Sequence, residues 1–269
     1  FVLTVHDVIP FDAKTSYLTW LLRLYHEADR IIVHAESNRD TIVGKFKVSP
    51  DRVSVIPMGP YLGFAEEQKL PASLAKQRLG FEPNTPVILF FGQIKRVKGL
   101  QYLIRAFRQV LEQHPSARLV IAGPEWKESF ASYADLIHEL NLADKVLTRI
   151  EYVPDNEVGV YYSAASVVAL PYTEAYQSAV LFMAYSFARP VVASAVGGLV
   201  EAVQDGVTGL LVPPADVNPL ANALITLLQD PEMARAMGEQ GQAMVETRFG
   251  WPKIARKIAA VYVDILRTD

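Results

Sequence analysis

The hydrophobic residues of this chain fall into short continuous runs that alternate with segments of helical spacing. Runs rich in Val, Ile and Leu without polar alternation are typical of strands buried on both faces of a sheet. We predict strands at residues 1–5, 30–33, 53–56, 87–91, 119–122, 146–148, 167–170, 191–193 and 209–212. Because helical segments separate most of these runs, the pattern indicates an α/β fold with doubly wound parallel sheets.

Helical periods fill the segments between the strands. In residues 99–113, for example, Leu103, Phe107 and Val110 fall on one face, as in an amphipathic helix. We also predict helices over 15–28 and 38–46, and helical structure throughout 219–268 with a break at 250–252. Residues 57–86 contain several prolines and no strong period, so we predict two short units and a linker there.

The two series of strands on either side of this linker differ in completeness. A Rossmann-like domain usually needs on the order of 100–150 residues, which only the second series reaches. Phe1 lies inside an apolar run, with no initiator Met or signal peptide, so we expect an earlier segment to precede it. The expected boundaries are 1–65 for the end of an N-terminal domain, 66–250 for a complete domain, and 251–269 for a terminal helix.

Composition excludes several classes of function. Hydrophobic residues make up 51% of the 269 residues, enough for a sizeable core, and the net charge of −3 gives no support to an electrostatic nucleic-acid partner. The chain has no Cys, and no two of its five His share a metal-ligand spacing, so no metal site is predicted. No apolar run reaches the roughly 18 residues of a membrane span. We expect a cytoplasmic protein, with peripheral contact at the inner face of the membrane left open.

The loop after the strand at 87–91 is the first candidate site. It reads Gly92-Gln93-Ile-Lys-Arg96-Val-Lys98-Gly99. Ligands bind at the carboxyl ends of parallel strands, where the backbone N–H groups of such a turn and the Lys98 ammonium suit a phosphate. The loop lacks the Gly-Lys-Ser/Thr ending of a P-loop, which argues against nucleoside triphosphate hydrolysis. A solvated basic turn is the alternative interpretation.

Two later strand ends carry further candidates. Ser178, at the head of an apolar helix, is a plausible N-cap, and free N–H groups there favour an anion. Glu174 in the same loop could accept hydroxyls of a sugar or ribose, and a surface carboxylate is the alternative. Gly197 and Gly198 follow the strand at 191–193, where they allow either close approach to a ligand or a turn with positive φ.

His6 is the one histidine whose position suggests a site, because it ends the first predicted strand. A structural role for it stays open. The other four histidines are interpreted as structural or solvated, since they fall on predicted helices or strand bodies: His26, His34, His114 and His138.

Taken together, these segments resemble retaining glycosyltransferases of the GT-B fold. The most specific match lies in 167–216, with the pattern PVVAS…GG..E…DG..G.LV.P.D. FFGQIKRVKGLQYLIRAF is similar to the phosphate-binding strand–loop–helix of that family. TVHDVIP, ADRIIVHAE and RVSVIPMGP resemble the second half of its N-terminal domain. The resemblance covers essentially the whole chain, without the family's first strands.

The resemblance implies two Rossmann-like domains, the first incomplete here, that close on a donor, with the helix from Trp251 onward crossing back to the first domain. It implies a hexosyltransferase-type enzyme that moves a sugar from a nucleotide-diphosphate donor to an acceptor hydroxyl, with retained configuration. It implies no metal and no other cofactor. The partners would be the nucleotide-sugar donor and a sugar or lipid-linked acceptor, as in polysaccharide or glycolipid biosynthesis.

Residue roles follow from the same resemblance. His6 would contact the donor sugar and Lys98 the donor diphosphate, as the catalytic residues. The remaining donor-binding positions would be Gly92, Gln93, Arg96, Glu174, Gln177, Ser178, Ala179, Gly197, Gly198 and Glu201.

Some positions depart from the family pattern. Gln93 stands where Arg is usual, which removes one positive charge, and Arg96 is a candidate substitute. A pair of Glu eight positions apart is also usual. Here those positions carry Ala175 and Met183, or Glu174 and Phe182 after a shift of one. We interpret the Gln-Ser-small-Val loop as a variant branch of the family.

Two other functions stay open at this point. One is a GT-B protein that binds a nucleotide sugar without turnover. The other is a different GT-B enzyme, such as a sugar-nucleotide epimerase or a phosphorylase, against which the DG..G.LV.P.D ending argues.

Overall fold

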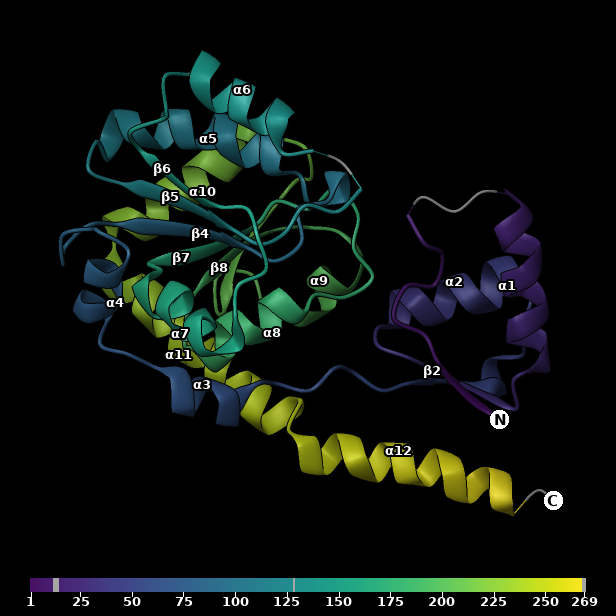
Figure 1. The fold of residues 1–269 in the computed structure, drawn as a ribbon. Coiled ribbons are helices and arrows are strands. Elements are labelled where there is room, and N and C mark those ends of the chain that lie inside the picture. The colour runs from purple at the N-terminus through teal and green to yellow at the C-terminus, as the bar shows by residue number, and fades with distance from the viewer. Residues whose placement is uncertain (12–14, 128, 268–269) are drawn as a thin grey trace.

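A computed structural model describes residues 1–11, 15–127 and 129–267 of the chain. Its elements form a smaller and a larger body, each built on a parallel sheet (Figure 1). The smaller sheet has the order β1-β2-β3, from β1 (Val2–Thr4), β2 (Arg30–Val33) and β3 (Val53–Val55). The larger has the order β6-β5-β4-β7-β8-β9. Its strands are β4 (Val87–Phe91), β5 (Arg118–Ala122), β6 (Val146–Arg149), β7 (Val167–Leu170), β8 (Val191–Ser194) and β9 (Gly209–Val212).

The expected α/β architecture with parallel sheets is confirmed. Helices cover both faces of the larger sheet, because the continuous apolar strands send alternate side chains to opposite faces. One face carries α5 (Leu100–Gln113), α6 (Ala131–Glu139) and α10 (Val217–Gln229). The other carries α7 (Asp155–Ala164), α8 (Ala179–Ser186) and the short α9 (Gly197–Ala202), with α11 (Pro231–Arg248) beside α8.

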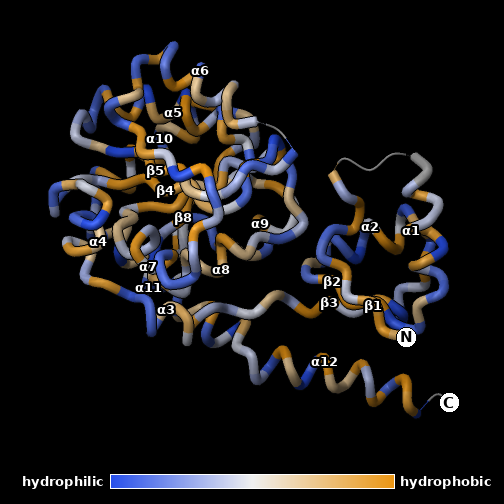
Figure 2. The backbone as a smooth tube through the Cα atoms, in the orientation of Figure 1, coloured by the Kyte–Doolittle hydropathy of each residue, from blue (hydrophilic) through white to orange (hydrophobic). Residues whose placement is uncertain are grey.

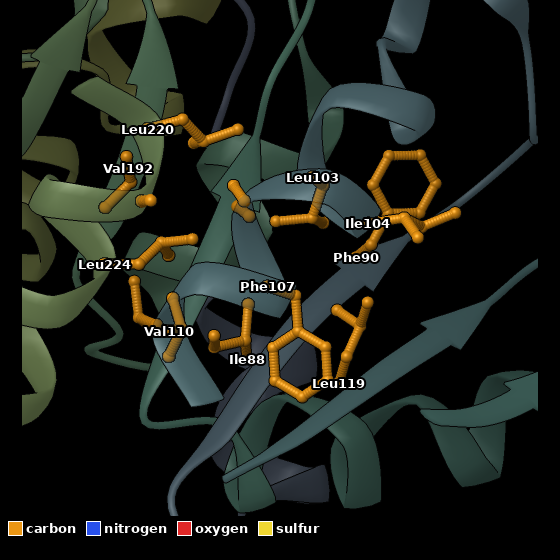
Figure 3. Close-up of a cluster of buried hydrophobic side chains, with 14 of the residues drawn as sticks. Ile88, Phe90, Leu103, Ile104, Phe107, Val110, Leu119, Val192, Leu220 and Leu224 are labelled. Atoms are coloured by element: carbon orange, nitrogen blue, oxygen red, sulfur yellow. The ribbon is translucent and has the colours of Figure 1, made fainter. Parts of the chain in front are cut away.

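The core between β4, α5 and α10 is fully apolar (Figure 3). Ile88 and Phe90 of β4 belong to this cluster, together with Phe107 of α5 and Leu224 of α10. Removing a fully buried Phe side chain such as that of Phe107 typically costs about 3–5 kcal/mol, so this packing fixes α5 and the loop before it.

The linker at 57–86 contains α3 (Leu62–Gln68) and α4 (Ala72–Arg78), which pack on α7 of the larger body. The prediction of helical structure throughout 219–268 with a single break at 250–252 was only partly right. The helix is also interrupted at Asp230, between α10 and α11. Pro231 restricts the residue before it and begins α11, and the Asp230 carboxylate accepts a hydrogen bond from the N–H of Met233, 2.9 Å away.

Helix α12 (Trp251–Leu266) runs from the larger body beneath the smaller one (Figure 1). Hydrophobic positions recur along this helix (Figure 2), and its Ile254 and Val261 are buried with Ile32 and Ile56 of the smaller body. The opposite face of the smaller sheet is covered by α1 (Thr15–Glu27) and α2 (Glu36–Phe46). The chain therefore crosses between the bodies twice, through the linker and before α12.

Candidate functional site

The order of the larger sheet reverses between β4 and β7. From β4 the chain proceeds outward to β5 and β6, and it then returns to β7 on the other side of β4. Loops that leave two neighbouring parallel strands in opposite directions open a crevice at their carboxyl ends, which is where ligands bind in such sheets. The loops after Phe91 and Leu170 therefore meet at this switch point.

Lys98 lies in this crevice, at the end of a single 3-10 turn (Arg96–Lys98) after β4. Its ammonium stands 5.6 Å from the ring centroid of Tyr172, which follows β7. A side chain at Gly92 would come within 3.0 Å of the Lys98 Nζ, so the glycine lets the cation approach the strand end. No carboxylate pairs with Lys98 among the described residues, and burial, with a smaller effect of Lys95, lowers its pKa to about 8. The site thus holds a cation without a counter-ion.

The N-terminus of α8 begins beside Lys98. Ser178 is its N-cap, with a hydroxyl that accepts from the N–H of Leu181. The N–H groups of Ala179 and Val180 find no acceptor in the part of the chain that the structure describes. A side chain at Gly92 would also touch Val180, 3.4 Å away, so these donors and the cation share one small region.

His6 follows β1 and is exposed at the edge of the smaller body, where its Nδ1 lies 3.0 Å from the Nε2 of His34. The Nδ1 of His34 lies 2.8 Å from the carbonyl oxygen of Ile56. Because a carbonyl only accepts, this Nδ1 carries the proton, and burial together with the nearby His6 lowers the pKa of His34 and favours its neutral form. His34 Nε2 then accepts from His6, which leaves the Nε2 of His6 as a free acceptor.

The interpretation of His34 as lying in a strand body was wrong. His34 comes directly after β2, at the same sheet edge as His6, because β1 and β2 are paired in parallel register. The spacing of the two strand ends in the sequence could have indicated this, since each predicted strand is followed at once by a histidine.

Gln177 connects the smaller body to the N-terminus of α8. Its amide Nε2 donates to the carbonyl oxygen of His34, 3.1 Å away, and its Oε1 accepts from the N–H of Ser178. The hydroxyl of Tyr176 also accepts from the N–H of Ile9 in the smaller body. The loop after β7 therefore links His34 to the helix that lies beside Lys98.

Glu201 of α9 reaches across to the smaller body. Its Oε2 and Oε1 accept from the N–H groups of Glu36 and Ser37, at 2.8 and 3.0 Å. These groups open α2, whose own N-cap residue, Ala35, has no side chain that could accept. The Glu201 carboxylate thus caps the N-terminus of a helix in the other body.

The glycine pair at the start of α9 is explained by neighbouring backbone. A side chain at Gly197 would collide with the carbonyl oxygen of Ala175, and one at Gly198 would collide with that of Tyr176. Gly197 also has a φ of +44°. Both residues hold α9 against the loop that carries Gln177.

Among the other positions, Gly92, Gln93 and Arg96 line pockets. Gln93 and Gly92 line a pocket of about 420 Å³ with Met183, Tyr152 and Val153. Arg96 instead lines a pocket of about 460 Å³ between the bodies, with Asp7, Phe11, Lys95 and Trp126. Glu174 and Ala179 are exposed beside the crevice. Arg96 and Gln93 thus line different pockets.

Residues 73–244 match the family model of "Glycosyl transferases group 1". The chain belongs to this family of glycosyltransferases.

Curated relatives agree with this assignment. D-inositol 3-phosphate glycosyltransferase of Corynebacterium kroppenstedtii is 29% identical over 252 residues, covering 91% of this chain and 55% of the relative. The protein of the same name from Kineococcus radiotolerans is 36% identical over 251 residues, covering 87% and 57%. This group 1 glycosyltransferase chain spans about half the length of the curated relatives it matches.

Solved structures confirm the GT-B fold. Sucrose-phosphate synthase from Thermosynechococcus elongatus matches with a TM-score of 0.87 at 28% identity, over 100% of this chain and 68% of that one. Anabaena HepE in complex with UDP-glucose matches with a TM-score of 0.87 at 23% identity, over 98% and 72%, which shows likeness of fold alone.

In this group 1 glycosyltransferase chain, no cluster of three or more metal-ligating side chains occurs within residues 1–11, 15–127 and 129–267. None of the described helices is long and apolar enough to span a membrane.

Proposed function

We propose that this chain provides the donor site of an enzyme that moves a sugar from a nucleotide-diphosphate donor to an acceptor hydroxyl. The observation that carries the proposal is the Lys98 ammonium, which pairs with no carboxylate among the described residues and lies beside the free N–H groups of Ala179 and Val180 at the switch point of the larger sheet. A diphosphate supplies the negative charge that both features favour.

The chemistry of the proposed reaction is charge stabilisation. When the bond between the anomeric carbon and the diphosphate breaks, negative charge develops on the leaving oxygen. The Lys98 ammonium and the N–H groups of Ala179 and Val180 would stabilise this charge, and they need no rearrangement because the fold already holds them in place. His6 would present its Nε2 acceptor to the sugar. We propose retention of configuration and a hexosyl group as the finer features of this reaction.

Names of similar proteins guide the choice of ligands. HepE was solved with UDP-glucose, so uridine nucleotides are the first donors to test. The curated relatives are named D-inositol 3-phosphate glycosyltransferase, so a phosphorylated acceptor is the first to test. The pocket between the bodies carries Lys95 and Arg96, cations that suit an anionic group on an acceptor.

We also propose that the reaction needs no metal ion. The enzyme would act in the cytoplasm, and it would contact the membrane peripherally when its acceptor is lipid-linked. Addition of EDTA should leave nucleotide binding unchanged. A loss of binding that added Mg²⁺ restores would contradict the metal-free proposal.

The deciding experiment is calorimetry of this chain with UDP, GDP, ADP and their sugar forms. We expect one nucleotide to bind, and Lys98→Ala to weaken it more than about tenfold, or about 1.4 kcal/mol. Lys257→Ala, which removes an exposed lysine from α12, is the matched control and should bind as the parent does. Equal affinity of the Lys98 and Lys257 variants would remove Lys98 from the site, and no binding of any nucleotide would contradict the donor site.

Binding without turnover is the second candidate function. Gln93 lines the pocket next to Gly92, where an arginine would have added positive charge. A chain that binds a nucleotide sugar but releases no sugar, either to an acceptor or to water, would favour this candidate.

A further inference from the structure

A second cavity lies at the opposite edge of the larger sheet. It has a volume of about 350 Å³ and opens at the amino ends of β4, β7 and β8. Helix α4 forms one wall, on the side of the larger body turned away from the smaller one (Figure 1). The five residues of β4 separate this cavity from Gly92 by about 17 Å at 3.3 Å per residue. It is therefore distinct from the crevice that contains Lys98.

Three cations line this cavity: Lys76 of α4, Arg189 before β8, and Arg235 of α11. None of the described lining residues is acidic. Arg235 pairs with Glu239 one turn further along its helix. Neither of the other two cations forms an ion pair within the described residues.

Arg189 is only partly satisfied by its surroundings. Its Nη1 donates to the carbonyl oxygen of Ala165, 3.2 Å away, at the C-terminal end of α7. The negative end of that helix compensates some of the guanidinium charge. The Nε of Arg189 is buried and has no acceptor in the described part of the chain.

The charge of Lys76 is compensated even less than that of Arg189. Lys76 forms no hydrogen bond in the described structure, and burial, with a smaller effect of Arg189, lowers its pKa. Two partly buried cations on the wall of one cavity repel one another, which is unfavourable unless negative charge accompanies them. An anion in the cavity would relieve both residues at once.

The size and walls of the cavity narrow the class of anion. A water occupies about 30 Å³, so the volume exceeds what a bare inorganic ion fills and lies in the range of small-molecule sites. The remaining walls are largely apolar, including Ala164, Pro190, Leu227 and Leu228. We propose that this cavity binds a small organic phosphate through Lys76 and Arg189, separately from the donor site.

Calorimetry with glucose 6-phosphate and AMP as probes tests this proposal. The titrations use the full chain carrying Lys98→Ala, so that the donor site contributes less, and binding that a change at Lys76 weakens is assigned to the cavity. We expect one probe to bind, and the further change Lys76→Gln to weaken it at least about tenfold. Lys69→Gln removes an exposed lysine of the same linker that does not line the cavity, and it should leave binding unchanged.

The thermal stability of the ligand-free chain provides a second test of the proposal. Arg189 bonds to Ala165 and its variants risk misfolding, whereas Lys76→Gln only removes an uncompensated charge. The midpoint of thermal unfolding should therefore rise in ligand-free Lys76→Gln and stop responding to the probe. Failure of both probes to bind at about 10 mM, or equal binding by the Lys76 and Lys69 variants, would overturn the proposal. Neither result bears on nucleotide binding at Lys98.

Discussion

His34 accepts a hydrogen bond from His6 while it donates one to the carbonyl oxygen of Ile56. The His6–His34 distance is 3.0 Å and the His34–Ile56 distance is 2.8 Å. His34 is 8% exposed, so its orientation is held by packing as well as by these bonds. The pair sets which nitrogen of His6 carries a proton.

The first prediction concerns this tautomer. In the native chain the Nε2 of His6 should be unprotonated, because its Nδ1 donates to His34. His34→Phe removes the acceptor, so the His6 Nε2 resonance should move toward the protonated range in ¹⁵N NMR. Stability should fall by about 1–3 kcal/mol, because the Ile56 carbonyl also loses its partner.

The matched control for this experiment is His26→Phe. His26 is exposed and its Nε2 lies 2.9 Å from the carbonyl oxygen of Phe46, so its removal should leave the His6 resonances in place. An Nε2-protonated His6 in the native chain would show that the two rings are bonded in the opposite sense.

The second prediction is the pH dependence of nucleotide binding. The pKa of Lys98 is about 8 in the empty site, and a bound diphosphate should raise it. Below pH 8 the ammonium is already charged, so the dissociation constant of the nucleotide should not change with pH. Above pH 8 binding must take up one proton, so the dissociation constant should rise about tenfold per pH unit.

Lys98→Arg tests the origin of this dependence. An arginine stays protonated throughout this range, so its dissociation constant should no longer change between pH 8 and pH 10. A rise in the arginine variant as steep as in the native chain would assign the titration to another group.

The third prediction concerns the cap that Glu201 provides. Glu201→Gln keeps the size of the side chain and removes its charge, so α2 should lose about 1 kcal/mol of stabilisation and the bodies should separate more readily. Small-angle X-ray scattering should report a larger radius of gyration. Glu246→Gln, at an exposed position of α11, is the control, and an equal change in both variants would contradict the role of the cap.

The fourth prediction concerns the place where the two chain crossings meet. A side chain at Gly59 would lie 2.5 Å from the indole of Trp251, whose Nε1 donates to the carbonyl oxygen of Pro60, 2.9 Å away. Gly59→Ala should displace the indole, lower the unfolding midpoint and shift the Trp251 fluorescence to the red. The other two tryptophans, Trp20 and Trp126, are replaced by Phe for this measurement.

Gly63→Ala is the matched control. Nothing lies within 4 Å of a side chain placed there, in α3, so this variant should gain about 0.5–1 kcal/mol from its helix propensity. Unchanged fluorescence and midpoint in Gly59→Ala would show that the indole does not depend on this contact.

The sequence by itself determined the strands, their parallel arrangement and the loops after β4 and β7. These follow from local patterns, because a strand buried on both faces must be continuously apolar and a turn such as the one at Gly92 needs its own residue types. The family resemblance came from the same local segments. The helical segment after residue 219 was predicted less well, since Pro231 was not recognised as the start of a new helix.

Only the tertiary structure decided which side chains meet. His34 and His6 are 28 positions apart, and Glu201 lies more than 160 positions from the helix it caps. Such partners depend on strand register and on the relative placement of two bodies, which no local period encodes. The burial that lowers the pKa of Lys98 arises in the same way, because it depends on residues that the fold brings from β7 and α8.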